Sequence, residues 1–214
     1  MTRLITKAAL LSACGMLVAV AAMAGVPSPG NSTYPSFIRV VGSAAGVSDS
    51  TAGKFTVIVR DVANNTIAGS FVTVDFSGCP DIKISNPQLN TNYTTNCANH
   101  TVSAYTSAAA PAGSVGFTIL GNSFNAGTYE GLGCAKIYAD GVLLTSATVA
   151  AFDLDATGGV TALDISVFLA DLGTHVYRGR ADYDANSAVS ALDLSVLLAE
   201  LGTHKSGVTL TACP

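Results

Sequence analysis

The sequence contains no tryptophan and only three histidines, and charged residues occupy just 11% of its 214 positions. Its ten lysines and arginines form no cluster and the formal net charge is −4, so the chain lacks the basic patch of a nucleic-acid-binding protein. The nucleophile elbow, the phosphate-binding glycine loop and the HExxH motif are also missing. Asp75 and Glu130 are lone carboxylates rather than an acid–base pair. We therefore expect neither nucleic-acid binding nor enzymatic activity.

Hydrophobic residues, in contrast, make up 49% of the chain, which is enough to fill a core. The charge content is too low for a disordered chain. The length allows one or two modest domains.

The N-terminus has the pattern of an export signal. Arg3 and Lys7 give a basic start, residues 8–21 are almost wholly apolar, and Ala22-Met23-Ala24 matches the small-x-small cleavage pattern. The apolar run is short for a membrane span of about 20 residues, and prolines follow it. We predict that residues 1–24 are a signal peptide cleaved near Ala24. The mature chain would then have no transmembrane span and would be secreted or held at the surface of a bacterium.

A bacterial lipoprotein signal is the alternative interpretation of this segment. The stretch Leu11-Ser12-Ala13-Cys14 matches it, and Cys14 would then become the lipidated first residue. The apolar stretch before Cys14 is very short, however, and the apolar run continues after it. Cleavage near Ala24 is therefore the preferred prediction.

Cysteine usage agrees with export. Once residues 1–24 are removed, four cysteines remain, namely Cys79, Cys97, Cys134 and Cys213. An even number in an exported chain indicates two disulfides, with three possible pairings. The short intervening loop favours Cys79–Cys97, which leaves Cys134–Cys213 to tie the C-terminal tail, residues 205–214, to the first domain. A zinc site is the alternative, but no CxxC or nearby histidine pattern supports it.

Residues 25–152 have the pattern of a β-domain. Residues 55–60 and 71–76 are alternating, β-branched segments, and the stretch between them has turn chemistry. Further short strands are predicted at residues 115–120, 135–138 and 142–151. About seven short strands separated by Gly, Asn and Ser fit an antiparallel β-sandwich. The strand–turn–strand segment 57–76 resembles the bacterial immunoglobulin-like domains of invasin and intimin, which implies an immunoglobulin-like sandwich.

The C-terminal part contains an internal repeat. Residues 153–175 align with residues 182–204 at 15 identical positions of 23, with a period of 29. Each copy carries oxygen-bearing side chains at positions 1, 3, 5, 9 and 12 of a loop, the ligand spacing of an EF-hand-type calcium site. The backbone carbonyl at position 7 adds a ligand, and the position 9 hydroxyl would act through water. The expected sites are Asp153, Asp155, Thr157, Gly159, Thr161 and Asp164 in the first loop, and Asp182, Asp184, Asn186, Ala188, Ser190 and Asp193 in the second.

A helix is predicted after each loop, over residues 165–172 and 194–201. Each helix should stop at a glycine, Gly173 or Gly202. Apolar residues recur at helical spacing, and we expect most of them to pack between the two helices. They are Leu163, Val167, Phe168 and Leu172 in the first copy, and Leu192, Val196, Leu197 and Leu201 in the second.

The pattern over residues 153–204 resembles the type I dockerin module. It consists of a calcium loop with Asp at position 12 and a single exiting helix, and the whole unit is duplicated. An ordinary EF-hand has Glu at position 12 and an entering helix, whereas a strand-like segment precedes Asp153 here. The resemblance implies two bound Ca²⁺ ions and a cohesin-like partner. In dockerins, positions 10, 11, 17 and 18 help to recognise cohesin and are often polar. Here they are apolar, namely Ala162, Leu163, Leu169, Ala170, Ala191, Leu192, Leu198 and Ala199.

The loops depart from the dockerin pattern at two positions, and their aspartates also have an alternative interpretation as helix caps. Thr157 is a weak, neutral ligand, and Ser187 replaces glycine at the sharp turn of the second loop, at a cost of about 1 kcal/mol. The pairs Thr161/Asp164 and Ser190/Asp193 also fit capping boxes, a role compatible with metal binding.

The sequence thus predicts a β-sandwich joined rigidly, without a linker, to a calcium-binding module. The predicted function is non-catalytic docking onto a cohesin-like or other surface protein. The alternatives are self-assembly with further copies into a calcium-dependent surface layer or fibre, or glycan binding by the sandwich.

Overall fold

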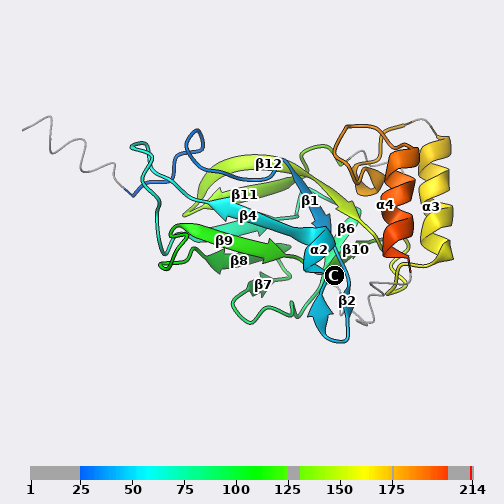
Figure 1. Cartoon of the computed structure of the whole chain (residues 1–214), viewed down its shortest axis with the longest axis horizontal. Helices are drawn as coiled ribbons and strands as arrows, with labels where there is room; N and C mark the ends of the chain where they lie inside the picture. The colour runs from blue at the N-terminus through cyan, green and yellow to red at the C-terminus, as the bar shows by residue number, and fades with distance from the viewer. Residues whose placement is uncertain (1–24, 125–130, 175, 202–212, 214) are drawn as a thin grey trace, which may run out of the picture.

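The computed structural model describes residues 25–124, 131–174, 176–201 and 213. The predicted signal peptide, Cys14, Glu130, Gly202 and all of the C-terminal tail except Cys213 lie outside these residues. Within them, the molecule is mainly β, with two helices at one end (Figure 1).

The largest sheet has six strands in the order β1-β12-β11-β5-β8-β7, and it is curled. Its strands are β1 (Phe37–Val40), β5 (Phe71–Asp75), β7 (Thr94–Asn96), β8 (Thr101–Tyr105), β11 (Ala135–Ala139) and β12 (Val142–Ala151). Neighbouring strands are antiparallel except β1, which runs parallel to β12. The strands expected near residues 55–60, 71–76, 115–120, 135–138 and 142–151 are therefore present, but one edge departs from a purely antiparallel arrangement.

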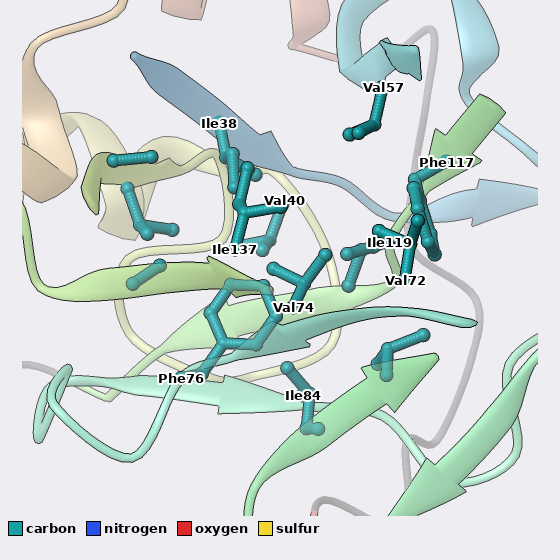
Figure 2. Packing of buried hydrophobic residues seen from close by; sticks show 14 of the residues in the cluster. Ile38, Val40, Val57, Val72, Val74, Phe76, Ile84, Phe117, Ile119 and Ile137 are labelled. Carbon is teal, nitrogen blue, oxygen red and sulfur yellow. The ribbon is translucent and has the colours of Figure 1, made fainter. Parts of the chain in front are cut away.

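The other strands form three antiparallel pairs. They are β4 (Lys54–Ile58) with β9 (Ser114–Thr118), β6 (Ile82–Ile84) with β10 (Gly121–Ser123), and β2 (Ser43–Ala44) with β3 (Val47–Ser48). A short helix, α2 (Ser50–Gly53), precedes β4. Figure 2 shows how Val57 of β4 and Phe117 of β9 share a core with Val72 and Val74 of β5 and Ile137 of β11. Alternation along each strand places these side chains inside, as the sequence pattern predicted.

The disulfides join Cys79 to Cys134 and Cys97 to Cys213, so the favoured pairing of Cys79 with Cys97 and Cys134 with Cys213 is wrong. The reason is sheet order. Cys79 follows β5 and Cys134 precedes β11, and these strands are antiparallel neighbours. Gly78 permits the close approach, because a Cβ there would lie 2.5 Å from the carbonyl oxygen of Cys134. The expectation that Cys213 ties the tail to the β part is confirmed, with Cys97 as its partner.

The repeats supply α3 (Ala162–Gly173), the short 3₁₀ helix η1 (Gly179–Ala181) and α4 (Ala191–Glu200). The two longer helices lie side by side beyond the end of β12 (Figure 1). A second hydrophobic cluster spans the junction between the β part and the repeats. Its members are Val41, Leu120, Ala150, Phe152, Leu154, Val160, Phe168, Ala181, Tyr183 and Leu197. Among the described residues, no helix is both long enough and apolar enough to cross a membrane.

Candidate metal centre

Both acidic loops, residues 153–164 and 182–193, adopt the same turn. The residue at position 4, Ala156 or Ala185, has a positive φ of 60° or 62°. Position 6 is also left-handed, with φ 91° at Gly158 and 66° at Ser187. The position 6 backbone nitrogen then donates to the first aspartate of its loop, at 3.0 Å in each copy. The two loops are therefore equivalent in conformation despite Ser187, whose side chain makes the left-handed turn less favourable.

The last aspartate closes each loop and caps the following helix. In the first copy, Asp164 accepts hydrogen bonds from the backbone nitrogens of Leu154 at 2.6 Å and Thr161 at 2.6 Å. In the second copy, Asp193 accepts the same bonds from Tyr183 at 2.6 Å and Ser190 at 2.9 Å. Both capping boxes predicted from the sequence are present. The helices consequently begin at Ala162 and Ala191, three residues earlier than expected.

Three carboxylates converge in each loop. Asp153, Asp155 and Asp164 each offer an oxygen, and these oxygens lie within 4.8 Å of one another. Asp182, Asp184 and Asp193 form the matching group in the second loop. In each group the first and last aspartates are buried, whereas the position 3 aspartate is the more accessible one. The sequence therefore identified both clusters correctly.

Two oxygens in these clusters have no hydrogen-bond partner among the described residues. Oδ1 of Asp153 and Oδ1 of Asp182 are buried and accept no hydrogen bond within the described part of the chain. The two residues are only 3% and 1% exposed. An unpaired buried carboxylate oxygen costs free energy, and a bound cation would remove that cost. Helix capping explains why Asp164 and Asp193 are buried, but it does not explain the unpaired Oδ1 atoms of Asp153 and Asp182.

The electrostatics favour a cation at the same place. Burial, together with the nearby charge of Asp164, raises the pKa of Asp153 to about 7. Burial also raises the pKa values of Asp164 and Asp182 above their usual range. Each shift records an environment that disfavours a negative charge on the carboxylate. A divalent ion held by three carboxylates would reverse this effect.

The remaining predicted ligands surround these clusters. Thr157 donates its hydroxyl to Asp155 at 2.7 Å, and the Asn186 amide nitrogen donates to Asp184 at 2.8 Å. The hydroxyls at position 9, Thr161 and Ser190, donate to the position 12 aspartate of their own loop at 3.1 and 3.0 Å. Gly159 and Ala188 occupy position 7 in each loop. The donor set therefore consists of oxygens, with three carboxylates in each loop, which suits a hard cation such as Ca²⁺ and not a soft metal.

The segment between the two copies makes contacts that sequence reasoning missed. Tyr177 donates its hydroxyl to Oδ2 of Asp182 at 2.9 Å, and burial followed by this bond raises the pKa of the phenol above its usual value. Arg180 forms a buried, two-pronged ion pair with Asp171 at the end of α3, at 2.8 and 2.9 Å. No local motif marks Tyr177 and Arg180, because both lie in the segment between the two copies, residues 176–181, outside the repeated pattern.

The helix faces agree with the sequence prediction only in part. Phe168 and Leu197 are buried, as expected. Leu163 and Leu192, however, are 59% and 64% exposed and Leu201 is 37% exposed, so the placement of these three in the core was wrong. The buried stripe of α3 begins at Asp164, because that side chain must point into the loop, and the preceding residue then lies about 100° away on the helix.

The exposed faces of the two helices are the same. Within α3 and α4, none of the exposed side chains is charged. They consist of Ala162, Leu163, Ser166, Leu169, Ala170 and Gly173 in α3, and of Ala191, Leu192, Ser195, Leu198 and Ala199 in α4. The four positions that help dockerins to recognise cohesin are among them in both copies.

Comparison with known proteins gives no relative for this chain. No protein-family model, curated protein or solved structure matches it.

Proposed function

We propose that this is an exported, non-catalytic calcium-binding protein whose C-terminal dockerin-like module attaches it to a protein partner at the cell surface. The observation that carries the proposal is the pair of acidic clusters, each with one buried aspartate oxygen that has no hydrogen-bond partner among the residues that the structure describes. Calcium takes six to eight oxygen ligands, and these loops present oxygens at the EF-hand spacing. The two disulfides fit an oxidising compartment.

The uncharged faces of α3 and α4 support the docking role. A solvated helix face normally carries charged residues, and leucines as exposed as Leu163 and Leu192 are unfavourable in water. Calcium would order both loops and so hold the two faces in one surface, because metal binding and folding of small metal-binding modules are linked. The immunoglobulin-like β part would act as the body that this module attaches.

The docking test uses immobilised full chain and a surface extract of the native culture, in calcium chloride or in chelator. The expected result is a partner retained in calcium and released by chelator. A Leu163→Glu/Leu192→Glu variant should bind calcium normally and lose the partner. Retention that is the same in all conditions and in the variant would contradict the docking role.

Self-assembly is a second candidate, favoured by the identical uncharged faces on the two helices. A surface whose two halves carry the same residues can pair with its own copy about a two-fold axis. Light scattering of the purified chain separates the two candidates. A molar mass that rises with calcium and falls in the same double variant supports self-assembly, and a constant monomer mass leaves docking onto another protein.

A further inference from the structure

Tyr183 occupies position 2 of the second loop, between the two aspartates Asp182 and Asp184. It is fully buried. Its backbone nitrogen donates to Asp193, the last acidic residue of the loop, at 2.6 Å. The position of Tyr183 therefore depends on how tightly the acidic residues of this loop are drawn together.

The side chain of Tyr183 leaves the loop and contacts the β part. Its hydroxyl donates to the carbonyl oxygen of Ala151, the last residue of β12, at 2.8 Å. Its ring stacks on that of Phe152, with centroids 4.8 Å apart and planes only 7° from parallel. Arg39 of β1 donates from Nε to the carbonyl oxygen of Tyr183 at 2.9 Å, and its Nη2 contacts the same atom. One residue of the second loop thus connects to two neighbouring strands of the large sheet.

The first loop is attached in another way. Leu154 occupies the same position 2, and an aliphatic side chain offers no hydrogen bond. The first loop does not need a side-chain hydrogen bond to stay attached to the β part, because Asp153 follows Phe152 directly in the chain. The backbone nitrogen of Ser123 also donates to the carbonyl oxygen of Asp153, which extends the β hydrogen bonding into the loop. The second loop lies 29 residues further along, and the Cys97–Cys213 disulfide is a further 20 residues beyond Asp193. The contacts that seat this loop itself against the β part are therefore non-covalent.

We propose that calcium in the second loop locks the helical module onto the β part through Tyr183, whereas calcium in the first loop stabilises mainly its own loop and α3. This inference rests on the proposed calcium binding. Without a cation, the carboxylates of Asp182, Asp184 and Asp193 lie within 4.8 Å of one another and repel. Opening of that loop moves Tyr183 away from Asp193, and the stacking on Phe152 and the bond from Arg39 are then lost together. The two sites therefore have different roles despite their matching ligands.

Hydrogen exchange of the full chain in calcium chloride tests this difference. The matched variants are Asp184→Asn and Asp155→Asn, which replace the position 3 carboxylate with a neutral amide in the second and the first loop. The readout is amide protection at residues 39–40 and 150–152, where β1 and β12 meet the module. We expect Asp184→Asn to lower this protection about tenfold or more, and Asp155→Asn to change it by less than about threefold. Equal effects, or a larger effect of Asp155→Asn, would overturn the proposal.

Tyr183→Phe keeps the ring and every metal ligand but removes the hydroxyl that contacts Ala151. Titration with calcium chloride should still give the wild-type stoichiometry, while junction protection falls. If circular dichroism shows that Asp184→Asn is unfolded, Tyr183→Phe becomes the test of the proposal. Unchanged junction protection in Tyr183→Phe would then refute the lock. If the wild type binds two ions but junction protection does not depend on calcium, the lock fails and the proposed function stands. If the wild type binds no calcium, both fail.

Discussion

The carboxylate of Asp164 accepts a hydrogen bond of 2.6 Å from the backbone nitrogen of Leu154, ten residues earlier in the chain. This bond closes the first loop, while the other oxygen of Asp164 caps α3 through Thr161. Capping and metal binding are therefore compatible roles for Asp164, so this residue alone does not distinguish a metal site from a helix cap. Asp153 does distinguish them, because its buried Oδ1 takes no part in the cap and has no partner among the described residues.

The stability of the calcium-free protein should depend on pH. The folded-state pKa of Asp153, about 7, lies above its ordinary value of 3.8, so the folded state binds more protons between these two pH values. The contribution of Asp153 to the free energy of unfolding of the metal-free protein is then fully present below about pH 4 and is lost as the pH rises to about 7. Because calcium binds deprotonated carboxylates, the stabilisation by calcium should grow over the same range.

Urea unfolding of metal-stripped protein at pH 5 and pH 8, with and without calcium chloride, checks this prediction. Asp153→Asn serves as the control, since its amide does not titrate, and it should flatten the pH dependence of the metal-free protein. A stabilisation by calcium that is equal at the two pH values would contradict the account.

Ser187→Gly should stabilise the second loop. Ser187 has φ 66°, a left-handed conformation that costs a residue with a side chain about 1–2 kcal/mol. The greater freedom of glycine in the unfolded chain offsets part of this, so we expect a net gain of about 0.5–1 kcal/mol. Gly158→Ser, the reverse change at position 6 of the first loop, should lower stability. Thermal unfolding in calcium measures both, and a destabilising Ser187→Gly would show that the turn is not strained.

The leucines of α4 should fall into two classes. Leu197 is fully buried, so Leu197→Ala should lower the free energy of unfolding by about 2–5 kcal/mol. Leu192 is 64% exposed, and Leu192→Ala should change it by less than about 0.5 kcal/mol. Urea unfolding of the monomer distinguishes them. Similar losses in the two variants would mean that Leu192 is covered, as the sequence pattern alone had suggested.

The disulfide pairing can be read from non-reduced peptides by mass spectrometry. Peptides should link Cys79 to Cys134 and Cys97 to Cys213. Removing the second bridge with Cys97→Ser/Cys213→Ser should lower stability by about 2–5 kcal/mol. A Cys79–Cys97 peptide would contradict the arrangement of β5 beside β11.

The sequence was sufficient where the structure depends on neighbours along the chain. The ligand spacing from Asp153 to Asp164 lies within one loop, and the repeat at Asp182 doubles the signal. Pairing of Cys79 with Cys134 was out of reach, because it depends on which strands are adjacent in the sheet. The apolar spacing around Leu163 is compatible with either a buried or an exposed side chain. Asp164 points into the loop, and this orientation turns the neighbouring Leu163 toward the solvent. The contacts of Tyr183 with β12 required the packing of the whole junction.

Calorimetric titration of the metal-stripped protein with calcium chloride shows whether the two loops bind calcium. We expect a stoichiometry near two ions per chain, one for each acidic cluster. Asp153→Ala should remove one site and leave the other, and Asp182→Ala should do the same for the second loop. Heat no greater than that of dilution for the wild type, or the loss of both sites in Asp153→Ala with the protein still folded, would contradict this expectation.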